Sequence, residues 1–280
     1  MENYELLDSG NGRKLEFFSG FIVDRPDPQA IWDITLPKSD WSADLTFTQN
    51  GSRGFWNEER ELPNPWKLKI GDNYFVLKKS IFKHLGVFPE QETVWRWLEG
   101  EIAKKSSIEK VSVLNLFAYT GGASMSCLRA GADVCHVDSS EFAIDCAKEN
   151  LIESGLSQKP IRFIVDDVKK FVDKEIRRGK KYDLIVLDPP VYGKGGGKSV
   201  WKLEDDLVPL LKNIKKLLST RPIGISISGY ASGFSHISYK QVLSDIFLDL
   251  GGSVFSGELS IKQKSIDKFL PCGIFARWER

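Results

Sequence analysis

The sequence predicts an α/β fold in which a mostly parallel sheet of seven strands ends in an antiparallel hairpin and follows a small β-rich module. Three observations support this prediction. Strand patterns alternate with helical patterns from about residue 90 onward, and such alternation produces parallel sheets covered by helices on both faces. The last two strand-like runs have no helix-length segment between them. The first 80 or so residues instead combine short strand patterns with turn signals.

The amino-terminal module is recognised by its short runs. KLEFFSGF, QAIWDI, ADLTFT and YFVLKKS alternate with turn sequences such as RPDP and NGSRG. We therefore predict a β-rich module at residues 1–82 and a second domain at residues 83–280. The module contains four tryptophans, which form a core if they are buried and can stack on bases if they are exposed: Trp32, Trp41, Trp56 and Trp66.

The second domain shows a regular succession of elements. Apolar residues at positions 94, 98 and 102 predict its first helix. Five apolar runs of strand length follow, at residues 111–117, 133–138, 161–165, 182–188 and 223–228, and the closing hairpin comprises SVFSGELSI and GIFARWE. Helical patterns separate the five runs, so we expect each strand to be joined to the next by a crossover helix.

Composition limits the class of protein. The net charge is +1, so a nucleic-acid partner must be held by a local basic patch. The polar start MENYELLDSGNG does not resemble a secretory signal, and no apolar run is long enough to cross a membrane. We therefore expect a cytoplasmic protein with no membrane partner. The four cysteines lack metal-ligand spacing, so we expect neither a metal nor a disulfide framework: Cys127, Cys135, Cys146 and Cys272.

The predicted strand ends hold the residues that suggest a ligand. Gly121 and Gly122 follow the first strand, where a backbone without Cβ atoms lets a ligand approach closely. A diphosphate fingerprint of the type G-x-G-x-x-G is missing. Asp138 ends the second strand and can accept hydrogen bonds from a ribose, while Asp167 and Val168 after the third strand can accept from an adenine amino group and cover its ring. The set fits S-adenosylmethionine better than a dinucleotide, although an aspartate at a strand end is also a common helix cap.

The fourth strand ends in Asp188-Pro189-Pro190-Val191-Tyr192. Two prolines cannot continue a central strand, so they fix a rigid turn whose carbonyl groups are free to face a ligand. We expect Tyr192 to pack on a planar methyl acceptor. A simple strand-stopping turn is the alternative.

At this point the sequence resembles a known family. LNLFAYTGG, HVDSS, AKEN, the aspartate pair and LDPPVYGKG occur in the order found in class I S-adenosylmethionine-dependent methyltransferases, most similar to bacterial large-subunit ribosomal RNA methyltransferases of the cytosine-C5 and guanine-N7 type. The likeness covers roughly residues 80–280 and includes HLGVFPEQETVW. It implies a Rossmann-like methyltransferase sheet and ribosomal RNA as the partner. By this resemblance the cofactor is bound by Phe88, Gln91, Phe117, Tyr119, Thr120, Gly121, Asp138, Ser139, Asp167, Val168 and Asp188, and the acceptor is faced by Asp188, Pro190 and Tyr192.

Two departures from that family restrict the chemistry. Cytosine-C5 methylation needs a cysteine thiolate, and the stretch after the fifth strand, ISISGYASGFS, contains none. Val191 also separates the second proline from the aromatic residue, unlike the motif of amino-methylating enzymes. We therefore expect direct, non-covalent methyl transfer to a base in RNA. A protein side chain or a small molecule is the alternative acceptor, and a cofactor-binding module without activity is a further alternative.

Two lysine-containing segments are candidates for RNA contacts. Lys194 and Lys198 lie in GKGGGKS, directly after the proline turn, and we predict that they bind the substrate backbone from a mobile loop. This stretch is not a nucleotide-phosphate loop, because Tyr192 occupies the place of its first required glycine. A second basic cluster surrounds one predicted helix and fits a solvated face equally well: Lys169, Lys170, Lys174, Arg177, Arg178, Lys180 and Lys181. The sequence does not indicate an oligomeric state.

Overall fold

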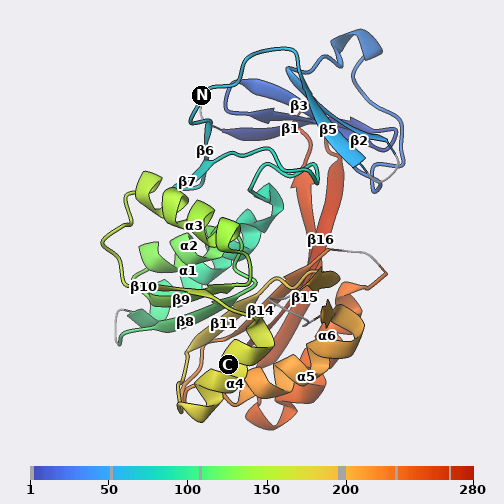
Figure 1. Cartoon of the computed structure of the whole chain (residues 1–280). Helices are drawn as coiled ribbons and strands as arrows, with labels where there is room; N and C mark the ends of the chain where they lie inside the picture. Colours follow the sequence, from blue (N-terminus) through green and yellow to red (C-terminus); the bar gives the residue numbers. More distant parts are fainter. Residues whose placement is uncertain (1–2, 51–52, 107–108, 195–199, 231–232, 265) are drawn as a thin grey trace. The chain divides into compact units, whose positions relative to one another are not determined.

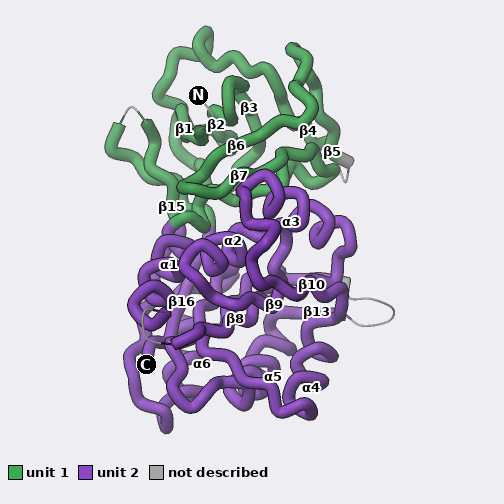
Figure 2. Tube along the Cα trace, turned by 90° about the vertical axis from the view of Figure 1, so that its left-hand side faces the viewer, with its two compact units in different colours: residues 1–92, 260–272 green, residues 93–259, 273–280 purple. Residues whose placement is uncertain are grey.

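The computed structural model describes residues 3–50, 53–106, 109–194, 200–230, 233–264 and 266–280. The chain divides into two compact units (Figure 2). Unit 1 comprises residues 1–92 and 260–272, and unit 2 comprises residues 93–259 and 273–280. The division falls after Glu92 rather than after residue 82, because the segment that follows still contacts unit 1: Lys83 Nζ donates to Pro26 O at 2.9 Å. The division into a β-rich module at residues 1–82 and a second domain at residues 83–280 stays a prediction.

Unit 2 contains the predicted seven-stranded sheet (Figure 1). The strand order is β10-β9-β8-β11-β14-β16-β15. The five strands from β10 to β14 are parallel, and β16 pairs antiparallel with β14. The strands are β8 (Ser112–Leu116), β9 (Asp133–Asp138), β10 (Ile161–Val165), β11 (Leu184–Leu187), β14 (Gly224–Gly229), β15 (Ser253–Lys262) and β16 (Phe269–Glu279). The predicted fold class is therefore confirmed.

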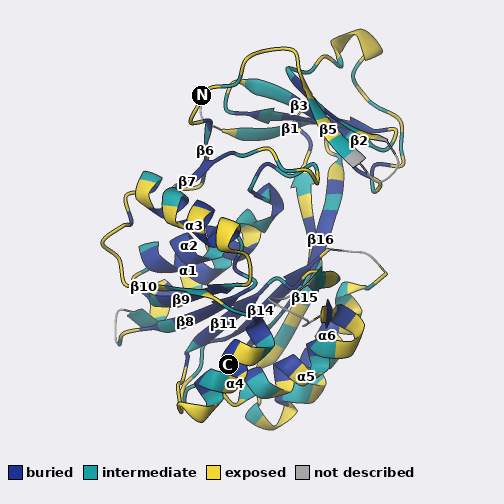
Figure 3. Ribbon diagram, in the orientation of Figure 1, coloured by how far each residue is buried: buried dark blue, intermediate teal, exposed yellow. Residues whose placement is uncertain are grey.

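Six α-helices of the described chain cover this sheet, with α1–α3 on one face and α4–α6 on the other (Figure 1). They are α1 (Glu92–Ser106), α2 (Gly122–Arg129), α3 (Glu141–Glu153), α4 (Val168–Arg177), α5 (Leu203–Lys215) and α6 (His236–Phe247). The central strands β8, β11 and β14 are buried on both faces (Figure 3). Alternate residues such as Leu114, Ile185 and Ile225 join the apolar core that packs on α4–α6. Within the described residues, none of the helices is long and apolar enough to span a bilayer.

Unit 1 is built on a five-stranded sheet in the order β1-β2-β3-β4-β5. Its strands are β1 (Tyr4–Gly10), β2 (Arg13–Phe18), β3 (Phe21–Pro26), β4 (Leu45–Asn50) and β5 (Arg53–Glu58), and a separate pair comprises β6 (Lys67–Ile70) and β7 (Asn73–Val76). The β3–β4 pair is parallel and the other pairs are antiparallel. The 3₁₀-helices of the described chain are η1 (Lys38–Asp40), η2 (Pro89–Gln91) and η3 (Leu248–Leu250).

One predicted strand of unit 1 is wrong. QAIWDI (residues 29–34) forms a loop, in which the carbonyl groups of Ala30 and Trp32 accept from the tight turn at Gly12 and Asn11. The buried carboxylate of Asp8 fixes the end of the loop by accepting two further backbone N–H groups. These local bonds replace the ladder that the alternating sequence predicted.

The tryptophans of unit 1 pack within it rather than forming an exposed stacking platform. Trp66 is buried beside Phe18 and Phe21. Trp32 and Trp56 are half-buried, and their indole N–H groups donate to backbone carbonyl oxygens at 2.8 and 2.7 Å. Trp41 is also half-buried. The packing interpretation therefore describes this module better than base stacking does.

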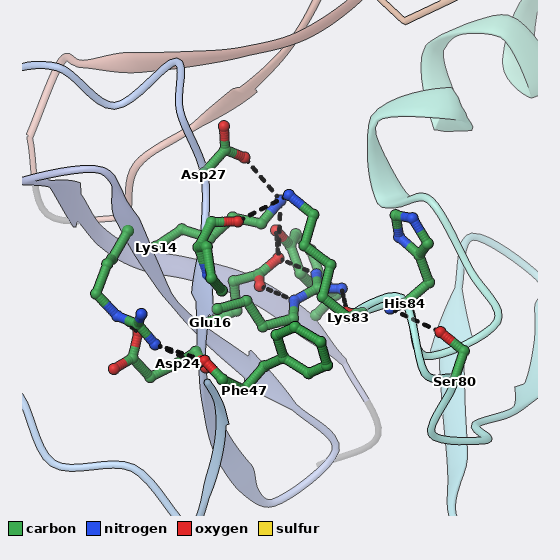
Figure 4. A network of polar contacts seen from close by, with 12 residues as sticks. Lys14, Glu16, Asp24, Asp27, Phe47, Ser80, Lys83 and His84 are labelled. Carbon is green, nitrogen blue, oxygen red and sulfur yellow. Dashed lines mark hydrogen bonds and ion pairs between the residues drawn. The ribbon is translucent and has the colours of Figure 1, made fainter. Parts of the chain in front are cut away.

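A buried ionic network joins β2 to β3 in unit 1 (Figure 4). The fully buried Glu16 accepts from Arg25 Nε and Nη2 at 2.7 and 2.8 Å, and from Tyr4 Oη at 2.9 Å. Lys14 Nζ lies 3.2 Å from Asp27 Oδ2. Burial opposes ionisation of Glu16, but Arg25 and Lys14 hold its pKa below the ordinary value. The carboxylate is therefore kept charged by its partners, and losing one of them would leave a buried charge unpaired.

Candidate functional site

The candidate site lies at the carboxyl edge of the unit 2 sheet. From β8 the chain runs outward through β9 and β10, and it then returns to β11 on the other side of β8. The carboxyl ends of β8 and β11 therefore form the switch point at which open α/β sheets bind their ligands. The predicted site residues that follow β8, β9, β10 and β11 all lie at this edge.

The turn after β8 has an unusual backbone. Phe117 and Tyr119 adopt left-handed φ angles of 52° and 48°, and Gly121 adopts 90°. Left-handed conformations are unfavourable for bulky side chains. Strain of this kind persists only where surrounding contacts hold it, and it is concentrated at ligand sites. The turn is therefore a pre-formed feature of unit 2.

Two side chains hold this turn in place. Asp138, the last residue of β9, accepts from the backbone N–H of Tyr119 through Oδ2 and from that of Ser140 through Oδ1, each at 2.9 Å. Burial raises the pKa of Asp138 above its ordinary value, although these backbone donors oppose the shift. Asn150 of α3 donates to the carbonyl of Thr120 at 2.9 Å. Nothing in the sequence pattern indicated this bond.

The two glycines of the turn serve a purpose that we did not predict. A Cβ atom on Gly122 would lie 2.2 Å from the ring of Trp95, and one on Gly121 would lie 3.2 Å from Ala147 Cβ. Protein atoms therefore occupy the positions that these Cβ atoms would take. The positive φ of Gly121 and the packing of Trp95 against Gly122 explain why both residues are glycine, and the close approach of a ligand to this backbone stays a prediction.

A chain of buried polar side chains lies beneath the turn. Asn115 Nδ2 of β8 donates to Ser124 Oγ at 2.9 Å, and that hydroxyl lies 2.9 Å from His136 Nδ1. Burial lowers the pKa of His136 to about 3, while the backbone of Tyr119 opposes the shift. The imidazole is therefore neutral at physiological pH. Sequence reasoning missed this chain, because its three members lie on β8, α2 and β9.

The two aspartates after β10, Asp166 and Asp167, bond to groups of their own segment and of α4. Asp167 caps α4, since its Oδ1 accepts from the backbone N–H of Lys170 at 3.1 Å. Asp166 accepts from the backbone of Asp167 and forms an ion pair of 2.6 Å with Lys174. Val168 is buried at the start of α4. The cap that we considered as an alternative is therefore real, and a role of Asp167 in adenine binding stays a prediction.

The proline turn after β11 is joined to the glycine turn after β8. Trp201 is 5% exposed, its Nε1–H donates to Pro190 O at 2.6 Å, and its ring lies 4.9 Å from that of Phe117 between centroids. The Pro190 carbonyl is thus occupied, contrary to our expectation that it would be free. Asp188 is half-buried and Tyr192 is 56% exposed. Trp201 is the clearest site residue that sequence reasoning missed.

The chain after the proline turn forms a short hairpin. Strands β12 (Tyr192–Lys194) and β13 (Val200–Lys202) pair antiparallel, where we had predicted only a loop. Lys198 and the side chain of Lys194 lie outside the described residues, as does most of the predicted mobile stretch. Phe88 and Gln91 belong to unit 1, where Phe88 packs on His84 and Gln91 ends η2. Their roles toward the cofactor stay predictions.

Other predicted groups are engaged in structural contacts. The basic cluster around α4 is partly neutralised, because Lys169, Lys174 and Arg178 pair with Asp206, Asp166 and Glu175. All four cysteines are buried as free thiols, and burial raises the pKa of three of them: Cys127, Cys135 and Cys272. Within the described residues, no group of three or more His, Cys, Asp or Glu side chains could hold a metal ion.

The strand order, the switch point and the acidic strand ends define a Rossmann-like methyltransferase fold. Comparison with known proteins places the chain more narrowly. A crystallised S-adenosylmethionine-dependent methyltransferase from Agrobacterium tumefaciens is 39% identical, has a TM-score of 0.94, and aligns over 99% of this chain and 90% of that protein. The chain therefore belongs to the S-adenosylmethionine-dependent methyltransferases. A Streptococcus mutans protein with 16% identity and a TM-score of 0.73 shares the fold over 98% of this chain and 74% of its own.

Sequence comparisons cover a smaller part of the chain. The family described as "Conserved hypothetical protein 95" matches residues 90–208. Ribosomal RNA large subunit methyltransferase I of Klebsiella pneumoniae subsp. pneumoniae is 30% identical over 160 residues, and the protein of the same name from an Enterobacter species is 38% identical over 160 residues. Each alignment covers 56% of this chain, which spans only 39% of either relative.

Proposed function

We propose that this protein transfers the methyl group of S-adenosylmethionine to a base of ribosomal RNA. The proposal rests above all on Asp138, whose carboxylate ends β9 beside the strained turn and is bonded to that turn through Tyr119. A carboxylate at the end of the second strand can accept hydrogen bonds from the two hydroxyl groups of a ribose. The turn beside it lacks the fingerprint of a diphosphate site.

The proposed cofactor contacts follow the strand ends. Asp138 and the adjoining Ser139 bind the ribose, Asp167 and Val168 bind the adenine, and the turn after β8 lines the methionine side through Phe117, Tyr119, Thr120 and Gly121. Phe88 and Gln91 flank the cofactor. These assignments agree with the chemistry of each side chain, and the residues from Phe117 to Val168 lie at one sheet edge.

The bound cofactor supplies an electrophilic methyl group on a sulfonium. The protein orients the acceptor, excludes water and receives a proton, which together account for catalysis of an in-line displacement. In this proposal Asp188 accepts the proton that an acceptor nitrogen loses as it gains the methyl group, while Pro190 and Tyr192 shape the acceptor side. The high pKa values of the buried thiols favour this direct route over a cysteine adduct.

RNA is the acceptor favoured by the relatives, whose names specify ribosomal RNA. Lys194 and Lys198 would then contact the RNA backbone. A protein or small-molecule acceptor is the second candidate. It is favoured by the net charge of +1 and by the internal pairing of the α4 lysines.

Two measurements test the proposal. Isothermal titration calorimetry should show one binding site for S-adenosylmethionine, and Asp188→Ala should transfer no methyl group. Tritiated methyl groups should pass to ribosomal RNA from a strain lacking the gene, and not to RNA from a strain that has it. An absence of cofactor binding would refute the activity. Label recovered in total protein instead of RNA would refute the substrate class and support the second candidate.

A further inference from the structure

Tyr239 of α6 has a buried hydroxyl group that serves no visible structural purpose. The residue is 2% exposed. Its Oη has no hydrogen-bond partner among the residues that the structure describes. A buried hydroxyl without a partner destabilises a protein, and phenylalanine would fill the same space without that cost. The oxygen atom is therefore not explained by stability.

The hydroxyl occupies a slot made by a glycine at the carboxyl edge of the sheet. A Cβ atom on Gly229, the last residue of β14, would lie 2.5 Å from Tyr239 Oη and 3.3 Å from the ring. Only a residue without a side chain leaves room for this hydroxyl. Gly229 therefore leaves room for the whole side chain, and the hydroxyl is the atom that a Cβ would contact most closely.

The slot lies next to the proline turn. Strands β11 and β14 are parallel, with Leu187 opposite Ile227. The residues that follow are Asp188 on one strand, and Ser228 and Gly229 on the other. Burial raises the pKa of Tyr239 to about 12, and the negative charge of Asp188 adds to this shift. The hydroxyl thus remains protonated at working pH and lies within the electrostatic field of that carboxylate.

We propose that Tyr239 is a positioning residue that donates a hydrogen bond to Asp188 when the methyl acceptor binds. An acceptor that displaces water from the half-buried carboxylate takes away part of its solvation, and the hydroxyl of Tyr239 can then replace that water as a donor. A donor from the α6 side holds the carboxylate oriented toward the acceptor nitrogen. This inference rests on the proposed function and adds a residue that acts through Asp188.

The test is Tyr239→Phe, with Tyr182→Phe as the matched control. Tyr182 is also buried, but it precedes β11 at the opposite edge, and its hydroxyl donates to Glu175 at 2.5 Å. Tyr239→Phe should unfold at the same temperature as the wild type or higher, and bind S-adenosylmethionine within twofold. Its kcat on ribosomal RNA from a strain lacking the gene should fall about tenfold, with KM unchanged. Tyr182→Phe should unfold at a lower temperature and keep its kcat within twofold.

The outcomes separate this inference from the proposed function. A wild-type protein that binds no S-adenosylmethionine would refute both. A wild-type protein that is active while Tyr239→Phe keeps its kcat within twofold would refute the positioning role alone. Lowered thermal stability of Tyr239→Phe would also refute it, because the hydroxyl would then have a structural partner. Gly229→Ala provides a second variant: its Cβ must displace the hydroxyl, so kcat should fall as in Tyr239→Phe.

Discussion

Replacing Trp201 by phenylalanine should weaken the link between the two turns at the switch point. The variant keeps an aromatic ring near Phe117 but loses the bond of 2.6 Å from the indole N–H to Pro190 O. Pro190 is an exposed residue, so its carbonyl can bond to water instead, and losing such a hydrogen bond costs about 0.5–1.5 kcal/mol. If this free energy is lost from the orientation of the proline turn, catalysis should fall by about 2- to 13-fold.

Trp278→Phe is the control for this experiment. Trp278 is also buried, and its indole N–H donates to Gly251 O at 2.7 Å. It pairs with Ile225 near the amino end of β14, away from the carboxyl edge. Urea unfolding should show similar losses of stability for the two variants, whereas kcat measured on ribosomal RNA should fall only in Trp201→Phe. Equal kcat values for the two variants would show that Trp201 stabilises the fold without organising the site.

Three further perturbations test separate parts of the structure. Asp138→Asn places an amide N–H₂ group against one of the two backbone N–H groups that donate to Asp138. The affinity for S-adenosylmethionine, measured by calorimetry, should therefore fall at least about tenfold. The control Asp145→Asn, which changes an exposed ion pair with Lys148, should leave this affinity unchanged. Glu16→Gln breaks the buried ionic network of unit 1 and should lower the free energy of unfolding, measured with urea, by about 3–5 kcal/mol. The control Asp72→Asn, which changes an exposed ion pair, should not lower it by a comparable amount. Because folding lowers the pKa of His136 from 6.5 to about 3, only the unfolded state binds its proton as the pH falls below 6.5. Its contribution to stability is therefore complete above pH 6.5 and is lost toward pH 3, by about 1.4 kcal/mol per pH unit, and His136→Asn should flatten that slope.

The strands and the positions of the acidic residues could be predicted because each depends on local sequence. Apolar runs bounded by helical patterns gave β9 and β10 their observed limits, and a parallel sheet brings successive carboxyl ends to one edge. QAIWDI was misassigned for the opposite reason. Its alternating pattern suits a strand, but its carbonyl groups at Ala30 and Trp32 accept from the backbone of Gly12 and Asn11, which lie far away in sequence.

The candidate site also includes side chains that do not lie at strand ends, and their positions depend on contacts between segments that are distant in sequence. Phe117 was predicted as a cofactor residue from its neighbours in sequence, but the indole that packs on it comes from β13, beyond the proline turn. Gly229 is a second example, because the need for a residue without a side chain at this position arises only from its contact with Tyr239 of α6. In the first case a side chain from a later element packs on a turn that the sequence had already located. We therefore predict that the strand ends select the ligand, whereas the elements after β11 orient the acceptor side, and only the three-dimensional structure shows the contacts on which this second property depends.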